Sequence, residues 1–425
     1  MGIYLNPGND NFTKALRTEN YVDKTGQIQF LNSLVNTPQR FVCVSRPRRF
    51  GKTMAADMIC AYYDRTAESR SLFERTLLPQ CEPVVVGGEE TQWDSYLKKF
   101  DVIKIDMSKF FNEDQEAGQS LKVMQLLVVR EIKREYPGID YFDEKNLVLT
   151  MDDVYSQVDR QVVFVIDEWD EVFRACQDDK EGQREYLKFL GDLLKDKPYI
   201  ALAYMTGILP IKKFGMHSGP NMFREYTMMH PWQLAQYCGF TEEEVRLLCE
   251  RHGRNFDHFK ARYDGYVLRG IVPPRKKDGD LSLLGQDAPR YHVYCPLSVA
   301  RAIKNRSLLN YWNNTESNEA LNIYIQRDFN GLKDAIALLM DGGRIRIDTS
   351  TFQNDMTTFH NKDDVLSLLV HLGYLGFDSI NSEVFIPNKE VMEVFKTCAK
   401  INSCISPTSQ ATSSTLARSR KCRTN

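Results

Sequence analysis

Four short apolar runs divide the first half of the chain, and segments with helical spacing lie between them. The runs are residues 41–44, 100–106, 161–167 and 199–205. Apolar runs of this length, rich in β-branched residues, indicate strands that are buried on both faces of a parallel sheet. Strands that alternate with helices in this way are typical of an α/β fold.

A helix is predicted directly after the first run. Met54, Met58 and Tyr62 recur every four residues, so one apolar stripe can pack back onto the sheet. The order strand, loop, helix places the intervening loop at the helix N-terminus.

From about residue 208 the pattern changes, first to a long loop region and then to mostly helical spacing. We expect an α/β core over residues 1–230 and a mostly helical region over 231–396. Within the latter, 331–396 fits either a winged-helix module or another small α+β unit. The last segment, 397–425, is rich in Ser, Thr and basic residues and has no acid, so we expect disorder. It is either a basic interaction tail or a segment without a specific function.

A Gly-Lys-Thr string follows the first run. Gly51, Lys52 and Thr53 would begin the helix, where unpaired N–H groups and the helix dipole bind phosphate. Lys52 could reach the outer phosphates, and the Thr53 hydroxyl could coordinate Mg²⁺. The standard pattern has a glycine five residues before Gly51, where this chain has Arg46. The string alone therefore fits either a phosphate-binding loop or a basic turn that opens a surface helix.

The third run ends in an acid pair, Asp167 and Glu168. Phosphate-loop ATPases hold Mg²⁺ with an acid at the end of a neighbouring strand and orient the attacking water with a base. Asp167 is the candidate to bind the metal, and Glu168 is the candidate to orient the attacking water. Strand ends often carry acids, but the pair together with the Gly-Lys-Thr string favours binding of ATP and Mg²⁺. The run at 100–106 fits those ATPases that place an extra strand between the two motif strands.

Other polar residues near the predicted strand ends have two interpretations each. Thr206 is either a sensor of the γ-phosphate or a simple residue between strand and turn. Tyr21 or Asp23 either approaches the base of the nucleotide or belongs to the start of a helix whose N-terminus is capped by Asp23 or Thr25. Four arginines are candidates for an arginine finger, and each could instead be a surface or fold-supporting residue: Arg46, Arg48, Arg49 and Arg224.

Composition restricts the classes of function. With 425 residues the chain is long enough for two or three domains. Lys plus Arg (55) nearly balances Asp plus Glu (57), so nucleic acid remains a candidate partner that the charge does not indicate. No apolar run approaches the roughly 20 residues of a membrane-spanning helix, and the N-terminus lacks a signal-peptide pattern. We therefore expect a cytoplasmic protein without a membrane partner. Its ten scattered cysteines show no zinc-ligand spacing.

Several strings together resemble the AAA-ATPase-like family of bacterial proteins. They are YVDKT at residues 21–25, SRPRRFGKT at 45–53, IDEWD at 166–170, TGI at 206–208, YDGY at 263–266 and PLS at 296–298. In that family the missing first glycine is normal, and Trp169 stands where the family usually has Tyr. The resemblance implies a nucleotide-binding loop that includes Arg48, Arg49 and Phe50 as well as Gly51, Lys52 and Thr53.

Many members of this family continue into a nuclease domain with an Asp and a Glu-x-Lys metal site. Glu131 and Lys133 form such a string here, but they flank the apolar stripe of a predicted helix and indicate a solvated face. We therefore expect the ATPase half without its nuclease. The overall prediction is a cytoplasmic Mg²⁺-dependent ATPase, with a protein partner or a second copy of the chain as candidate partners. The alternatives are a nucleotide-gated binding module with little turnover and a metal-dependent nuclease.

Overall fold

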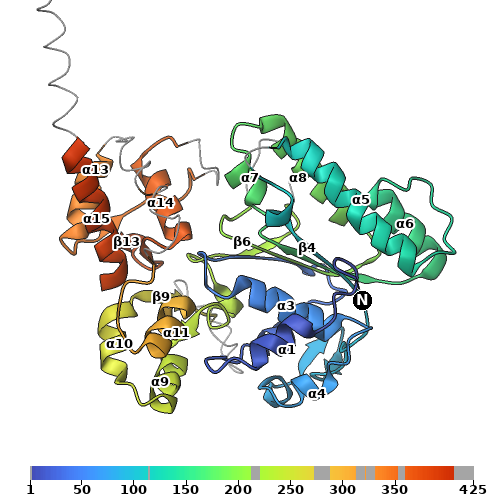
Figure 1. The fold of residues 1–425 in the computed structure, drawn as a ribbon, viewed down its shortest axis with the longest axis horizontal. Helices are drawn as coiled ribbons and strands as arrows, with labels where there is room; N and C mark the ends of the chain where they lie inside the picture. The colour runs from blue at the N-terminus through green and yellow to red at the C-terminus, as the bar shows by residue number, and fades with distance from the viewer. Residues whose placement is uncertain are drawn as a thin grey trace, which may run out of the picture.

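The structure is a computed structural model (Figure 1). It describes residues 2–112, 115–211, 221–271, 288–312, 321, 331–352 and 359–405, with the side chains of 401–405 left aside.

Five parallel strands form the central sheet, in the order β4, β5, β6, β1, β7. They are β1 (Phe41–Ser45), β4 (Asp101–Asp106), β5 (Val162–Asp167), β6 (Ile200–Gly207) and β7 (Arg224–Tyr226). The predicted parallel α/β sheet is confirmed. The expectation that the 100–106 strand lies between the two motif strands is wrong, because β4 is an edge strand. The strand between β1 and β5 is β6, whose eight residues are all buried.

Strand β7 lies in a segment predicted as loop. It has three residues, two of them the charged Arg224 and Glu225, so no apolar run marks it. It pairs with β1, with Arg224 opposite Val42.

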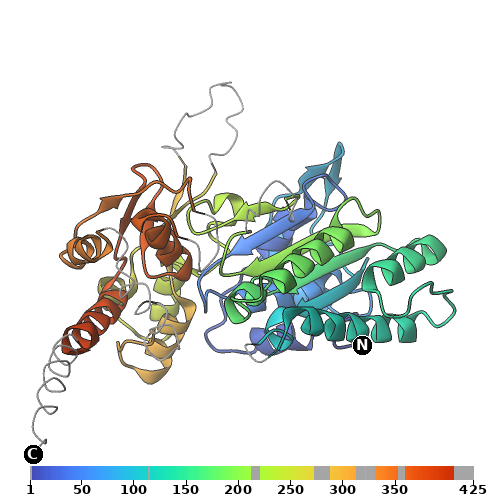
Figure 2. The same ribbon diagram turned by 90° about the horizontal axis from the view of Figure 1, so that it is seen from above.

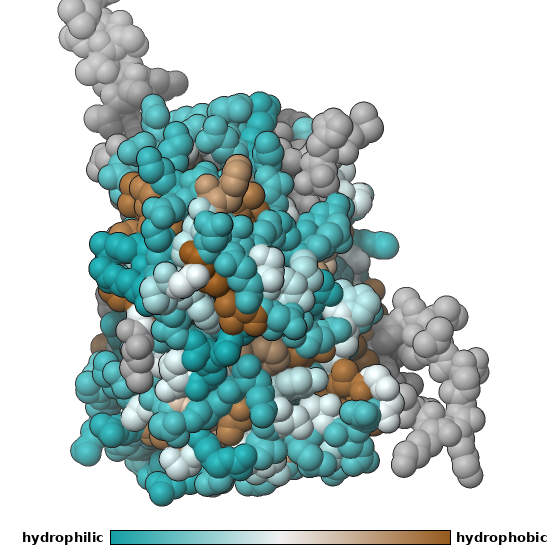
Figure 3. All heavy atoms as spheres, turned by 90° about the vertical axis from the view of Figure 1, so that its right-hand side faces the viewer, coloured by the Kyte–Doolittle hydropathy of each residue, from teal (hydrophilic) through white to brown (hydrophobic). Residues whose placement is uncertain are grey.

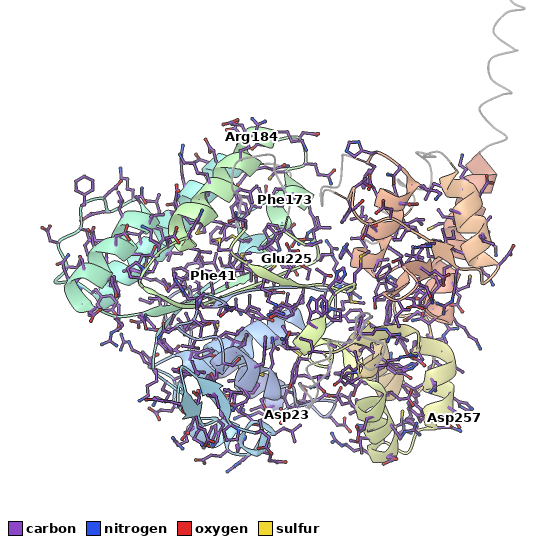
Figure 4. The ribbon with its side chains drawn as sticks, turned by 180° about the vertical axis from the view of Figure 1, so that it is seen from behind. Asp23, Phe41, Phe173, Arg184, Glu225 and Asp257 are labelled. Carbon is purple, nitrogen blue, oxygen red and sulfur yellow. The ribbon has the colours of Figure 1, made fainter. Side chains whose placement is uncertain are left out.

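Helices cover both faces of the sheet (Figures 1 and 2). One face packs on α1 (Asp10–Leu16), α2 (Gly26–Asn32) and α3 (Lys52–Tyr63), and the other on α5 (Ala117–Glu135), α6 (Leu147–Val158), α7 (Glu171–Ala175) and α8 (Lys180–Leu194). The side chains of β1 alternate between the faces, with Phe41 and Cys43 toward α5 and α8, and Val42 and Val44 toward α3. Figure 4 shows Phe41 and Phe173 on the side of the sheet covered by α5 to α8.

The predicted apolar stripe of α3 is correct at two of its three positions. Met58 and Tyr62 are buried against the sheet, whereas the Met54 side chain is 46% exposed. Met54 belongs to the first turn of α3.

Short elements complete the N-terminal half. These are α4 (Arg70–Phe73) and the hairpin of β2 (Val84–Val86) and β3 (Glu89–Thr91).

The C-terminal part contains two small antiparallel sheets among its helices, which the sequence predicted only in part. One sheet has the order β8 (Phe240–Thr241), β10 (Arg290–Tyr294), β9 (Tyr266–Arg269), and the other β11 (Ile345–Arg346), β13 (Glu383–Phe385), β12 (Gly376–Asp378). The helices are α9 (Glu242–Arg251), α10 (Phe256–Tyr263), α11 (Pro296–Asn305), α13 (Leu332–Met340), α14 (Lys362–Leu372) and α15 (Lys389–Ile405). The predicted capping box at the start of α9 is present, with Thr241 and Glu244 bonded reciprocally.

Residues 331–396 follow the predicted order of helix, strand, helix and hairpin, with β13 between β11 and β12. The winged-helix assignment itself stays a prediction. Helix α15 extends to Ile405, so the helix includes the first residues of the segment expected to be disordered. Residues 406–425 lie outside the described residues.

The surface carries isolated apolar side chains. Figure 3 shows a mainly hydrophilic face with scattered hydrophobic patches. Among the described residues, no helix combines the length and the hydropathy that a membrane crossing requires.

Candidate functional site

The carboxyl ends of β1, β4, β5 and β6 meet at one edge of the sheet. The strand register places Val44 opposite Thr206, and Asp106 opposite Asp167. The loop between β1 and α3, residues 46–51, therefore lies beside the acid pair that follows β5. In open α/β sheets this edge is where ligands bind.

Gly51 connects the loop to α3. It has φ +85° at the helix N-cap, and a Cβ at this position would meet nothing within 4 Å. The requirement for glycine is thus the left-handed backbone rather than lack of space. Arg49 also has a positive φ, +71°. The loop consequently leads into a helix N-terminus with its free N–H groups, as the sequence predicts.

The Lys52 side chain is folded into the loop and is almost completely buried. Its Nζ donates to the carbonyl oxygens of Arg46 and Pro47, at 3.1 Å each. It also lies 3.7 Å from Glu168 Oε1. One ammonium group thus connects the two motifs.

Asp167 is buried at the end of β5. Burial raises the pKa of the Asp167 carboxyl to about 6, while a hydrogen bond with the Thr53 side chain lowers it and the charges of Glu168 and Asp106 raise it. A cation beside this carboxyl would favour its ionised form. The hydroxyl of Thr53 and the carboxylate of Asp167 are hard oxygen donors of the kind that Mg²⁺ prefers, so these residues fit the ion.

Glu168 has a strained backbone and a fully engaged carboxylate. Its φ is +50°, in the left-handed region that non-glycine residues rarely adopt. Its Oε1 faces Lys52 and its Oε2 accepts a short hydrogen bond from Arg174 Nη2.

Arg174, on α7, is a site residue that the sequence predictions missed. Its guanidinium also contacts Asp170 (Nε to Oδ2, 3.2 Å) and Glu171 (Nη2 to Oε2, 2.5 Å), and 9% of its side chain is exposed. Burial lowers the pKa of Arg174, but the three carboxylates outweigh burial and raise it above its usual value. Asp170 and Glu171 precede Arg174 by four and three residues at the start of α7, and this spacing is the signal that could have identified it.

Thr206 lies at the end of β6, between the two motif strands. Its carbonyl oxygen accepts from Trp169 N–H at 3.0 Å. Its hydroxyl is buried and has no hydrogen-bond partner within the part of the chain that the structure describes. A buried hydroxyl without a partner is rare and suits a ligand-sensing position.

The arginines considered for a finger role lie in different environments. Arg46 is fully buried, and its Nη1 donates to the carbonyls of Ser45 (2.9 Å) and Tyr226 (2.8 Å), which is the fold-supporting alternative. Arg48 and Arg49 are exposed on the loop, and Arg224 is exposed with its guanidinium over the Tyr226 ring. Phe50, which follows Arg49, is buried.

Asp23 does not point toward the loop. Its carboxylate accepts from Thr25 N–H (2.8 Å), Thr25 Oγ1 (2.7 Å) and Leu77 N–H (2.8 Å), which matches the helix-start alternative. Tyr21 and Asp23 line a cavity of about 810 Å³ next to α9, and no residue of 46–53 lines it. Figure 4 shows Asp23 on the side of the sheet that α1 and α3 cover.

The Glu-x-Lys string on α5 is only half solvated. Lys133 pairs with the exposed Glu144 at 2.7 Å, as expected for a surface residue. Glu131 instead accepts hydrogen bonds from the N–H groups of Ile3, Tyr4 and Leu5, at 2.8 to 3.0 Å. It anchors the N-terminal segment.

The sheet order, the loop after β1 and the acid pair after β5 define a phosphate-loop ATPase-like module, with β6 inserted between the two motif strands. The family model described as "Predicted AAA-ATPase" matches residues 7–217. This part of the chain belongs to the AAA-ATPase-like family.

A curated relative is described as an uncharacterized protein in the vnfD 5' region of Azotobacter chroococcum mcd 1. It is 24% identical over 302 residues, which are 69% of this chain and 50% of the relative. The chain therefore spans about half the length of that relative.

Two solved structures share similarity with the chain at low scores. The Aeropyrum pernix ORC2 protein is 10% identical with a TM-score of 0.33, over 93% of this chain and 99% of that one. Cdc6p from Pyrobaculum aerophilum is 12% identical with a TM-score of 0.25, over 89% and 93%. With values this low, the fold assignment rests on the strand order itself.

Proposed function

We propose that the chain binds ATP with Mg²⁺ and hydrolyses it, and that the nucleotide cycle drives a conformational change. Lys52 would contact the outer phosphates, Thr53 and Asp167 would hold the metal, and Glu168 would orient the attacking water. Thr206 would sense the γ-phosphate. The backbone N–H groups of Arg48, Arg49, Phe50 and Gly51 would line the phosphates. Bound Mg²⁺ would neutralise developing phosphate charge.

The observation that carries this proposal is the convergence of the two motifs. Lys52 Nζ lies 3.7 Å from Glu168, and the Thr53 side chain bonds Asp167, although the motifs are far apart in the sequence. A basic turn that opens a surface helix would not bury its lysine beside an acid pair at the sheet edge.

Two substitutions test the assigned roles. Lys52→Ala should abolish binding of ATP, because it removes the cation that meets the phosphates. Glu168→Gln should keep binding but retain ATP uncleaved, because the amide cannot act as base. Calorimetric titration with ATP and Mg²⁺, followed by analysis of the bound nucleotide, measures both. Equal binding and equal turnover in wild type and both variants would contradict the proposal.

A second candidate function is a nucleotide-gated switch with little turnover. The hydrogen bond from Arg174 to Glu168 favours it, because it occupies a carboxylate oxygen that would otherwise accept from the attacking water. Tight ATP binding with negligible phosphate release, with or without DNA, would identify the switch.

The wider context remains a proposal as well. Because many members of the family that the chain resembles carry a nuclease domain, we propose that this chain is the ATPase half of a nuclease-linked protein. A cytoplasmic location stays a prediction, as do a protein partner and a homo-oligomer.

A further inference from the structure

The phosphate loop packs against the C-terminal part of the chain. Phe50 is 1% exposed, and its ring lies edge-on to Tyr266 (centroids 5.6 Å apart) and Trp312 (6.5 Å). Phe50 therefore belongs to the C-terminal hydrophobic cluster, which also contains Tyr374 and Phe395, and not to the clusters on either face of the sheet. Figures 1 and 2 both show the C-terminal elements beside the end of the sheet where α3 begins.

A second loop residue, Pro47, touches the C-cap of α14. Gly373 has φ +87° there, and a Cβ on it would come within 2.8 Å of the Pro47 ring and 2.9 Å of Trp312. The Tyr266 hydroxyl donates to the Gly373 carbonyl at 2.5 Å. Contacts of Pro47 and Phe50 with Tyr266, Trp312 and Gly373 thus form one connected group, called here the loop contact.

The loop contact is placed where it can control phosphate binding. A loop binds phosphate through backbone N–H groups, and these must hold one geometry. Here the usual first glycine is replaced by Arg46, whose side chain bonds Ser45 and Tyr226 below the loop. Gly239 N–H donates to the Phe50 carbonyl at 3.1 Å. The loop is therefore supported from outside the strand–loop–helix unit.

We propose that Tyr266, Trp312 and Gly373 are positioning residues for the phosphate loop, which act through Pro47 and Phe50. Because coupling between two sites is reciprocal, bound nucleotide would in turn stabilise the seating of the C-terminal part on the loop. This inference rests on the proposed ATP site and deepens it. Nucleotide binding would affect the C-terminal part of the chain through the loop contact.

A matched pair of glycines tests the proposal in the full chain. Gly373 and Gly342 both have φ +87°, so alanine imposes the same backbone strain at each. At Gly342 a Cβ meets nothing within 4 Å, whereas at Gly373 it meets Pro47. Hydrogen exchange of the peptide containing residues 46–53 and the dissociation constant for ATP are measured in both variants.

Gly373→Ala should raise exchange in the loop severalfold and weaken ATP binding on the order of tenfold. Gly342→Ala should change neither. Loop exchange and ATP affinity that match the wild type in Gly373→Ala, or that shift equally in both variants, would overturn the proposal. Hydrogen exchange of the loop is measured without nucleotide, so it tests the loop contact independently of ATP. A wild type that fails to bind ATP would contradict the proposed function alone.

A second pair decides the question if Gly373→Ala does not fold. Trp312→Phe replaces the ring that meets Phe50 with a smaller one, and Phe395→Leu trims a buried ring of the same cluster that lies edge-on to Tyr374. The two variants are compared under conditions where their free energies of unfolding are equal. Hydrogen exchange of the loop should then rise in Trp312→Phe and stay at the wild-type level in Phe395→Leu. Equal exchange in these two variants would overturn the proposal.

Discussion

The Asp167 carboxyl lies between the sheet and α3, and its surroundings set its charge. Because burial raises its pKa to about 6 from an ordinary 3.8, the folded state binds a proton more tightly than the unfolded chain. This group therefore lowers the free energy of unfolding as pH rises from about 4 to about 6, by up to about 3 kcal/mol.

Asp167→Asn removes that penalty. The variant should be more stable than wild type at pH 7.5 and equally stable below about pH 4, while Mg²⁺-dependent ATP binding is lost. Urea unfolding at pH 4, 5.5 and 7.5 without nucleotide measures the difference. A stability difference that stays constant with pH would show that the folded state does not raise this pKa.

We expect the hydrogen bond from Arg174 to limit the proposed role of Glu168 as a base. Arg174→Gln should free the Glu168 carboxylate and raise steady-state phosphate release severalfold, at a stability cost of about 1–3 kcal/mol. Asp170 keeps the N–H groups of Ile208 and Leu209, so the fold should survive. Arg184→Gln, an exposed arginine on α8 labelled in Figure 4, is the control. Unchanged or lower release would show that the Arg174 contact supports the fold only.

Among the elements, long buried strands were predictable and short ones were not. Strands β1, β4, β5 and β6 are apolar runs because both of their faces are covered by helices. Strand β7 and the six short C-terminal strands have two to five residues, so their pairing depends on tertiary contacts that leave no periodic pattern. The same limit applies to Phe50, whose partners Tyr266 and Trp312 come from distant segments.

The connection between β1 and β7 predicts a specific role for Arg46. Arg46→Ala should lower the free energy of unfolding by about 2–4 kcal/mol, because the carbonyls of Ser45 and Tyr226 lose a buried charged donor. Arg75→Ala removes an exposed arginine and should change stability by less than about 0.5 kcal/mol. Urea unfolding measures both, and equal effects would refute the fold-supporting role of Arg46.

For the whole molecule, the ATPase-like module and the C-terminal part are joined at the loop contact. The described residues offer no support for nuclease chemistry at the Glu-x-Lys string, because Glu131 binds the N-terminal backbone and Lys133 pairs with Glu144. We expect the purified chain to leave supercoiled plasmid intact in Mg²⁺ or Mn²⁺. Metal-dependent nicking that disappears in Glu131→Gln would contradict this expectation.

Steady-state release of phosphate from ATP tests the account most directly. The wild type should release phosphate in Mg²⁺ and stop when EDTA is added, while Lys52→Ala stays at background, because we propose that Lys52, Thr53, Asp167 and Glu168 form one ATP site. Native mass measured in the same samples would show whether the form that releases phosphate contains a second copy of the chain. Wild-type release no faster than that of Lys52→Ala would contradict ATP hydrolysis by this chain.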